Sequence, residues 1–338
     1  MSGLLDRIAD HAHTRRRVVG MLAAGLVVGP LAATRAVAQD RLSIATGGTG
    51  GVYYPYGGAL ANVISEAVGG VEVTAEVTAA SVDNMLLIEA QDADLAFVLA
   101  DTAADATAGR PPFPQPIPAR SLATLYNNFT HVVTTGGSGI ETLADLAGKR
   151  VSTGAAGSGT EVIANRLLEA AGLDPAQDIQ REQLGASESA DAMRDGQIDA
   201  FFWSGGLPTA ALTDLAASPN VDFRLLPNGE FAGALQDAFG TFYGTATVAA
   251  GTYPGQDEEV EVVVVPNVLV VNEAMDEQLA YDIVKAMFDN RDDLVAAHPA
   301  AEELTVETAV LNSPLPLHPG AARYYQEQGI DPAATPVG

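Results

Sequence analysis

Hydrophobic positions in residues 41–100 alternate between the two-residue period of strands and the 3.6-residue period of helices. The predicted elements are, in order, a strand at 42–45, a helix whose apolar face holds Leu60, Val63, Ile64 and Ala67, a strand at 71–78, a helix that opens at 80–84, and a strand at 93–99. Strands that alternate with helices are typical of an α/β fold with a parallel sheet.

The rest of the chain continues this pattern as far as residue 215 and then becomes less regular. The pattern indicates strands at 122–126 and 131–135, a short helix, a turn and a strand within 140–153, helices at 160–171 and 187–194, a strand at 198–203, a helix from Pro208 to Leu215, a β-rich run at 260–271 that Pro266 interrupts, and helices from Met275 and at 321–328. Five prolines make 109–119 irregular, and 219–250 mixes strand fragments with loops.

Three of the predicted strand-to-helix junctions are rich in glycine. They lie at 46–51, 154–159 and 204–206. Glycine lets the backbone approach a ligand closely, and the N-terminus of a helix offers unpaired N–H groups to an anion. The junctions therefore predict a binding cleft in which a carboxylate ligand lies between two lobes.

The charge of the chain limits the class of its partners. The 338 residues carry a formal charge of −26, and the only lysines are Lys149 and Lys285. Such acidity argues against nucleic acid or an anionic membrane as a partner. The sequence has no cysteine, so disulfides and thiolate chemistry are not available to it.

The first 38 residues have the composition of a secretory signal peptide. Arg15-Arg16-Arg17 precede an apolar run from Val18 to Ala33, and Ala36-Val37-Ala38 form a small-x-small cleavage site. We expect cleavage after Ala38 and a periplasmic protein. The three arginines also resemble a twin-arginine signal, although valine follows them, so the export route stays open. Cleavage removes five arginines and two aspartates, which takes the formal charge from −26 to −29.

Motifs of common catalytic and cofactor sites are incomplete in this sequence. Tyr53 stands where a dinucleotide-binding fingerprint requires glycine, and Arg150 follows Gly148-Lys149 where a phosphate-binding loop requires serine or threonine. Ser138 and Ser158 each lack one of the two glycines of a nucleophile elbow. We therefore expect a protein without enzymatic activity and without a cofactor.

Metal-binding spacings are also missing. His131, His298 and His318 are scattered along the chain, and no two of them have the spacing of metal ligands. The acidic run at 257–261 is interpreted as a solvated turn. We expect no metal site.

Several longer motifs resemble one known family. They are TGGTGGVYYPYGGALA at 46–61, TAASVDNMLLI at 78–88, LADLAGKRVSTGAAGSGTE at 143–161, DGQIDAFFWSGGLPTAAL at 195–212 and VPNVLVVN at 265–272. In this order they are similar to the substrate-binding receptors of tripartite ATP-independent periplasmic (TRAP) transporters, in particular the TAXI subfamily. The motifs extend over almost the whole chain after the signal peptide.

The resemblance implies a fold, a domain division and a function. The implied fold class is α/β, the type II periplasmic binding-protein fold, with two α/β lobes joined by hinge strands and a ligand cleft between them. Lobe 1 is expected to contain residues 39–128 and 265–338, and lobe 2 residues 129–264. The implied function is to bind a small organic acid or acidic amino acid, such as glutamate or 2-oxoglutarate, and to deliver it to TRAP membrane permease subunits. We expect a monomer.

Matching motifs also imply a set of ligand-binding residues. They are Gly48, Thr49, Gly50, Tyr53, Tyr54, Ser81 and Asn84 in the first lobe, and Ser158, Gly159, Thr160, Trp203, Ser204 and Gly206 in the second. Ser81 has an alternative interpretation as a helix N-cap, and Trp203 as a core residue. No basic side chain is among these residues, so hydroxyl groups and backbone N–H groups would have to solvate the anion.

Two other functions remain open from the sequence. A sensor subunit would bind a similar ligand and dock onto a signalling partner instead of a permease. An exported hydrolase is a third reading, but the sequence lacks an assembled nucleophile and base.

Overall fold

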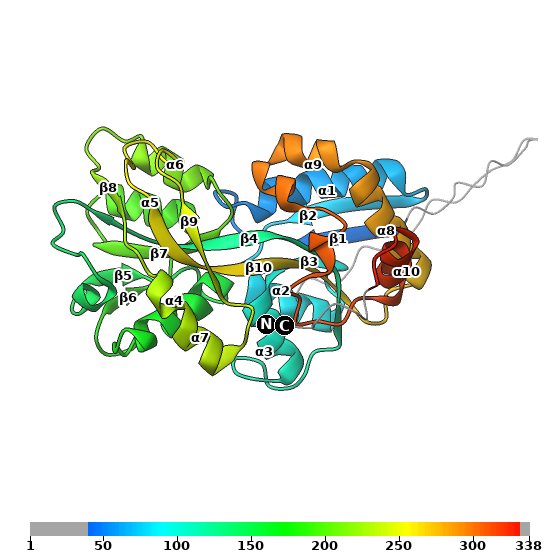
Figure 1. The fold of residues 1–338 in the computed structure, drawn as a ribbon, viewed down its shortest axis with the longest axis horizontal. Helices are drawn as coiled ribbons and strands as arrows, with labels where there is room; N and C mark the ends of the chain where they lie inside the picture. Colours follow the sequence, from blue (N-terminus) through cyan, green and yellow to red (C-terminus); the bar gives the residue numbers. More distant parts are fainter. Residues whose placement is uncertain (1–39, 332–338) are drawn as a thin grey trace, which may run out of the picture. The chain divides into compact units, whose positions relative to one another are not determined.

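One mixed sheet of ten strands runs through residues 40–331, the part of the chain that the computed structural model describes (Figure 1). The strands are β1 Asp40–Ala45, β2 Val71–Glu76, β3 Leu95–Leu99, β4 Ala119–Thr135, β5 Arg150–Ser152, β6 Gln180–Glu182, β7 Ala200–Gly205, β8 Phe223–Leu225, β9 Gly244–Val248 and β10 Val260–Asn272. Their order is β2-β1-β3-β10-β4-β7-β5-β6, with β8 paired to β4 and β9 to β10.

Helices follow most of the strands. They are α1 Tyr53–Ala67, α2 Ser81–Ala90, α3 Ala100–Ala108, α4 Gly159–Ala170, α5 Ala186–Arg194, α6 Ala210–Ala216, α7 Ala232–Phe239, α8 Glu277–Asp289, α9 Arg291–Ala297 and α10 Pro319–Glu327. Short 3-10 segments cover Leu143–Leu146, Gly229–Phe231, Pro299–Glu303 and Thr308–Val310.

Two groups of parallel strands repeat the same arrangement. In the first group β1 lies between β2 and β3, and in the second β5 lies between β6 and β7; all four pairings are parallel. Each group therefore places its second, first and third strands in that spatial order. The α/β class that the hydrophobic periods predict is confirmed.

The long strands β4 and β10 join the two groups. They lie side by side and antiparallel across the middle of Figure 1, and Phe129 of β4 is paired with Val264 of β10. The lobe boundaries expected from the sequence, after 128 and after 264, fall at this pair. β10 reaches β3 with residues 267–271 and β9 with residues 260–264.

Pro266 does not interrupt β10, contrary to the sequence-based prediction. On one edge of β10, Pro266 falls between the residues that pair with β9 and those that pair with β3. Proline is tolerated in a strand where its missing N–H falls outside the ladder. On the other edge β10 continues its pairing with β4, with irregular register after Asn267.

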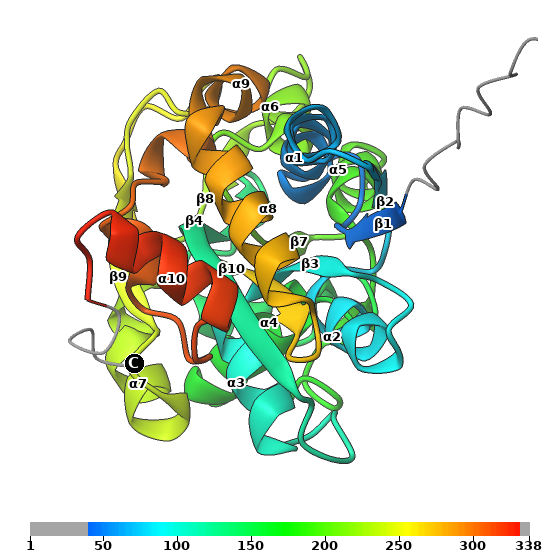
Figure 2. The same ribbon diagram turned by 90° about the vertical axis from the view of Figure 1, so that its right-hand side faces the viewer.

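Helices cover both faces of the sheet. The apolar sides of α2, α3, α4 and α7 pack in one core, which contains Met85, Ala103, Ile163 and Leu235. The opposite face is covered by α1, α8 and α10 over the first group of strands, and by α5 and α6 over the second. Figure 2 shows α8 and α10 side by side over β10 and β4.

Several local predictions differ from the structure. The short helix expected near 140–146 is a 3-10 turn at Leu143–Leu146, and 219–250 contains α7 in addition to strand fragments. Ser81 is the first residue of α2 and does not cap it, because the N-cap is Ala80. The Ser81 hydroxyl instead accepts a hydrogen bond from Leu99 N at 3.1 Å.

Within residues 40–331 no helix is long and apolar enough to cross a membrane. The signal peptide expected at residues 1–38 lies outside the described residues.

Candidate ligand-binding site

A cavity of about 360 Å³ lies where the parallel strands of both groups end. Ligands of open α/β sheets bind outside the carboxyl ends of the strands. The lining comes from the junctions β1–α1, β2–α2, β5–α4 and β6–α5, and from the end of β7. The structure thus brings residues from distant parts of the sequence to one site.

Most of the residues that the sequence indicates line this cavity. They are Gly48, Thr49, Gly50, Tyr53, Ser81, Ser158, Gly159, Thr160, Trp203 and Ser204. Tyr54, Asn84 and Gly206 are not in the lining.

These three residues lie elsewhere for different reasons. Tyr54 is on the exposed side of α1. Asn84 is fully buried, and its Nδ2 donates to the carbonyl oxygens of Thr46 and Phe97, each at 2.8 Å, so the side chain ties α2 to β1 and β3. Gly206 packs so closely against Tyr126 that a Cβ at this glycine would lie 3.1 Å from the tyrosine ring.

The N-terminus of α4 is rich in hydrogen-bond donors. The Ser158 hydroxyl caps the helix by accepting from Glu161 N at 3.1 Å, and Thr160 Oγ1 accepts from Ser204 N at 3.2 Å. Since each hydroxyl already accepts from a backbone N–H, its O–H is available to donate. In the first turn of α4, Glu161 N and Val162 N bond to Ser158, which leaves the N–H groups of Gly159 and Thr160 without an acceptor in the helix. This corner of the cavity is suited to an acceptor such as a carboxylate oxygen.

Ser204 adds a further unsatisfied group to the same corner. Its side chain is buried at 7% exposure, and its Oγ has no hydrogen-bond partner within residues 40–331. Buried polar atoms in proteins are nearly always hydrogen-bonded. The Ser204 hydroxyl is therefore a candidate ligand contact on structural grounds as well.

The glycine loop after β1 closes over the cavity from the other side. A Cβ on Gly51 would lie 2.8 Å from the Trp203 ring, and Gly50 O accepts from Ala211 N at 3.3 Å. Trp203 is itself fixed, because its Nε1 donates to Thr209 Oγ1 at 2.9 Å. The loop after β1 and the end of β7 are thus in direct contact.

The N-terminus of α2 is already engaged across the cleft. Gly157, in the glycine loop before α4, accepts from Val82 N at 3.1 Å and from Asp83 N at 3.2 Å through its carbonyl oxygen. These two donors are used by the protein itself. The anion-binding helix ends available in this conformation are therefore those of α1, α4 and α5.

The α5 junction was missed by the sequence analysis. Residues 183–188 line the cavity with Gln183, Ser187 and Glu188 among them. Their segment QLGASE follows a strand of three residues, β6, which is too short to give a periodic signal. The small residues Gly185-Ala186-Ser187 before a helix were the signal that could have identified it.

Tyr53 forms part of the wall between the two sides. It is buried against Phe97, with the ring centroids 5.3 Å apart. Burial raises the pKa of the Tyr53 hydroxyl, while hydrogen bonds from Ser81 and Asn267 oppose that rise. Tyr53 is therefore a neutral phenol at ordinary pH.

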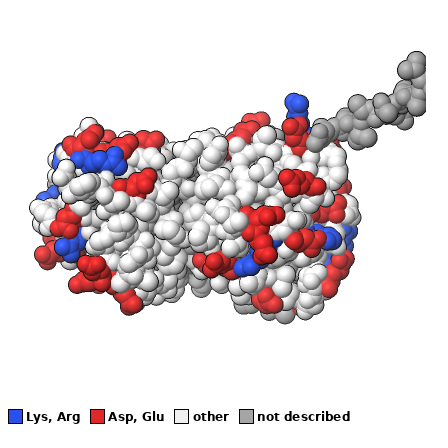
Figure 3. All heavy atoms as spheres, turned by 90° about the horizontal axis from the view of Figure 1, so that it is seen from above, with Lys and Arg blue, Asp and Glu red and all other residues white. Residues whose placement is uncertain are grey.

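The cavity has little charge of its own. Glu188, an exposed residue in the first turn of α5, is the charged side chain in the lining, and no lysine, arginine or histidine belongs to it. On the surface in Figure 3, charged side chains lie to either side of a broad uncharged region in the middle. Among residues 40–331, no group of three or more histidines and acidic residues is placed to hold a metal ion.

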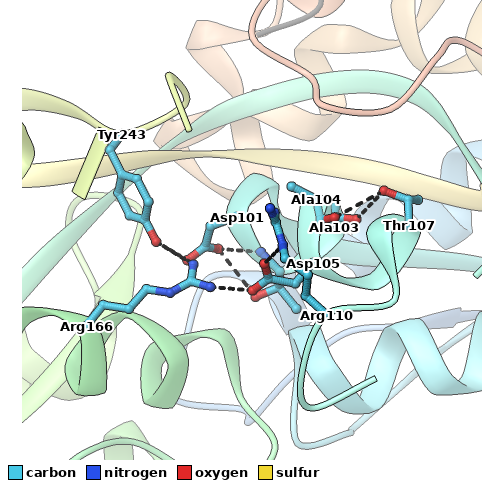
Figure 4. Close-up of polar contacts among 9 residues, drawn as sticks. Asp101, Ala103, Ala104, Asp105, Thr107, Arg110, Arg166 and Tyr243 are labelled. Carbon is cyan, nitrogen blue, oxygen red and sulfur yellow. Dashed lines mark hydrogen bonds and ion pairs between the residues drawn. The ribbon is translucent and has the colours of Figure 1, made fainter. Parts of the chain in front are cut away.

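A buried ion pair connects α3 and α4 next to the sheet (Figure 4). Arg166 Nη1 lies 3.3 Å from Asp101 Oδ2, and Arg166 Nη2 pairs with Asp105. Tyr243 donates to Asp101 Oδ2 at 2.8 Å. Burial raises the pKa of the Asp101 carboxyl, and the Arg166 guanidinium opposes that rise. None of these residues lines the cavity. Their contribution is to hold α3 and α4 together.

Comparison with protein families gives a clear assignment. Residues 44–329, most of the chain, match the NMT1-like family. The chain belongs to this family. The matched region includes every element from the end of β1 to α10 and therefore the whole cavity lining.

Solved structures are similar to this NMT1-like protein in fold. A protein of Bordetella bronchiseptica RB50 has a TM-score of 0.52 at 20% identity, covering 88% of this chain and 94% of that one. The periplasmic aliphatic sulphonate binding protein SsuA from Escherichia coli has a TM-score of 0.45 at 15% identity, covering 85% and 83%. A putative L-cystine ABC transporter from Listeria monocytogenes has a TM-score of 0.46 at 13% identity, covering 78% and 95%.

The fold is that of the type II periplasmic binding proteins. It consists of two α/β lobes joined by hinge strands, with a ligand cleft between them. The repeated strand order and the long crossing strands β4 and β10 are the features of this chain that agree with it.

Proposed function

We propose that this protein is the periplasmic solute receptor of a TAXI-type TRAP transporter. It binds a small carboxylate, such as glutamate or 2-oxoglutarate, in the cavity between its lobes and delivers it to membrane permease subunits without converting it. The lobes are residues 39–128 with 265–338 and residues 129–264, and β4 and β10 act as the hinge. Motifs such as residues 46–61 and 143–161 support the subfamily, and the shared fold supports solute binding.

The observation that carries the proposal is the donor-rich corner at the start of α4. Ser158 and Thr160 accept backbone hydrogen bonds and therefore turn their O–H groups to the ligand, beside the N–H groups of Gly159 and Thr160 at the start of the helix. A carboxylate supplies only acceptors, so it satisfies these donors together. A cationic or purely donor ligand would leave them unpaired, at a cost for each buried group.

A thermal-shift screen of residues 39–338 against small organic acids and amino acids tests the proposal. A ligand present at a hundredfold its Kd adds about 2.7 kcal/mol of stability. Ser158→Ala removes one donor, and we expect it to weaken carboxylate binding by about tenfold or more. The variant also removes a helix cap, which costs about 1 kcal/mol by itself.

Asp276→Ala is the matched control for the lost cap. Asp276 caps α8 by accepting from Leu279 N at 2.9 Å and lies outside the cavity lining. It should lose similar stability and keep full ligand affinity. Stabilisation by neutral or cationic solutes alone would contradict the carboxylate assignment, and turnover of the bound ligand would contradict the receptor role.

A further inference from the structure

Three buried polar side chains lie in a row on β4 and β7, and one of them borders the cavity. Asn128 and Thr130 of β4 are fully buried, and Ser204 of β7 is nearly so. Both amide atoms of Asn128, and the hydroxyl oxygens of Thr130 and Ser204, have no hydrogen-bond partner within residues 40–331. Unpaired buried polar atoms of this kind are rare in native proteins and need a partner.

The pairing of the strands places these side chains on the same face of the sheet. Thr130 is directly opposite Ser204 in the antiparallel pair of β4 and β7, so the two side chains project to one side. Asn128 is two residues before Thr130 on the same strand and therefore projects to that side as well. Its partner on β10, Val265, belongs to the core under α2, α3 and α4.

Ser204 connects this row to the cavity. It is part of the cavity lining, and its backbone N–H donates to Thr160 at the donor-rich end of α4. The row of Ser204, Thr130 and Asn128 thus leads from the site of the carboxylate toward the hinge. Asn128 and Thr130 themselves are fully buried and outside the lining, so a ligand group reaches them past Ser204.

We propose that Asn128, Thr130 and Ser204 form a second subsite that binds an uncharged hydrogen-bonding group of the ligand. The inference rests on the proposed function, and it narrows the ligand class to carboxylates that also carry an amide, carbonyl or hydroxyl group. The chemistry of the row determines this choice. An asparagine amide and two hydroxyls both donate and accept, and they carry no charge to neutralise an ammonium or a second carboxylate.

The test compares two ligands of equal shape on matched variants. Glutaramate ends in a primary amide, and 5-methylhexanoate has an isopropyl group in its place. Titration calorimetry of the wild type should show at least a tenfold preference for glutaramate. Asn128→Leu, which has nearly the same side-chain shape without polar atoms, should abolish that preference and bind 5-methylhexanoate at least as well as the wild type does.

Two further variants separate the subsite from a merely structural role. Thr130→Val keeps the shape of the side chain and should reduce the preference in the same direction, so the test does not depend on one variant folding. Ser121→Ala removes another buried hydroxyl without a partner among residues 40–331. Ser121 is also on β4, about 23 Å along the strand from Asn128. It should leave the preference unchanged. An unchanged preference in Asn128→Leu and Thr130→Val overturns the proposal and assigns the row to ordered water.

Failure of the proposed function has a different result. If neither carboxylate binds to the wild type, the receptor assignment for carboxylates fails, and butyramide then tests the subsite alone. Binding of butyramide to the wild type and its loss in Asn128→Leu support the subsite. If the wild type does not bind butyramide either, the subsite is refuted together with the carboxylate.

Discussion

The indole ring of Trp203 lies against Gly51 so closely that a Cβ on Gly51 would be 2.8 Å from the ring carbon Cη2. Contacts of this length are shorter than side chains adopt in folded proteins. Trp203 has no freedom to withdraw, because its Nε1 donates to Thr209 and its carbonyl oxygen accepts from His131 Nδ1. Only glycine at position 51 permits the loop after β1 to close on β7.

Gly51→Ala should therefore weaken ligand binding by at least tenfold, because the added methyl group prevents this closure. The single tryptophan provides the readout, since its emission should change when a ligand binds to the wild type and should change less in the variant. Gly58→Ala is the control, because a Cβ at Gly58 meets nothing within 4 Å. Equal affinity in Gly51→Ala and the wild type would show that closure against Trp203 is not needed.

Adjacent glycines in α1 should respond in opposite directions to alanine. A Cβ on Gly57 would lie 2.5 Å from Thr46 Cγ2, and Thr46 is held by a 2.6 Å hydrogen bond to Glu76 O. Gly57→Ala should destabilise the protein by about 1–3 kcal/mol through overpacking. Gly58→Ala should stabilise it by about 0.5–1 kcal/mol, since alanine is the better helix former. Chemical denaturation measures both, and a stabilising Gly57→Ala would contradict the packing seen here.

Loss of Arg166 should be costly. Its removal leaves Asp101 buried without a counter-charge, and breaking such a buried pair destabilises by about 3–5 kcal/mol. We expect Arg166→Met to lower the free energy of unfolding by an amount in this range. Arg224→Met breaks the exposed pair with Asp222 and should change stability by less than about 1 kcal/mol. Similar effects of the two variants would show that the α3–α4 pair is not a strong constraint.

His131 should make stability dependent on pH. It is fully buried between Trp203 O and the Tyr253 hydroxyl, and burial lowers the pKa of His131 to about 4. In the unfolded chain the imidazole of His131 has the ordinary pKa of 6.5 and becomes protonated below that pH. The contribution of neutral His131 to folding stability is therefore complete above pH 6.5. As pH falls from 6.5 to 4 the contribution is lost, by about 1.4 kcal/mol for each pH unit.

His131→Gln isolates this effect from the many carboxylates that also titrate in acid. The difference in the free energy of unfolding between wild type and variant should fall by about 3 kcal/mol between pH 7 and pH 4. A difference that does not change with pH would mean that the pKa of His131 is the same in the folded and unfolded states.

The hydrophobic pattern predicted most of the secondary structure, and it did so for a local reason. Residues 41–100 alternate between two clear periods, and each period depends on neighbouring positions only. Predictions were wrong where tertiary pairing decides the outcome. Pro266 lies within β10 because it falls between the residues that pair with β9 and those that pair with β3. The Ser81 hydroxyl accepts a hydrogen bond from Leu99 N of β3 and does not cap its own helix.

The candidate site shows the same division. Glycine junctions and family motifs pointed to Ser158, Thr160 and Trp203, because the residues of each junction are adjacent in the sequence. Asn128 had no such signal, since it lies in the middle of a long strand with no motif around it.

The elements, their α/β order and the glycine-rich loops that line the cavity could be predicted from the chain alone, because these depend on the spacing of neighbouring residues. The three-dimensional fold was needed to see which loops meet across the cleft, that Gly157 O accepts hydrogen bonds from the start of α2, and that Thr130 lies opposite Ser204. These relationships join residues far apart in the chain. They follow from strand pairing and core packing, which a local pattern does not record.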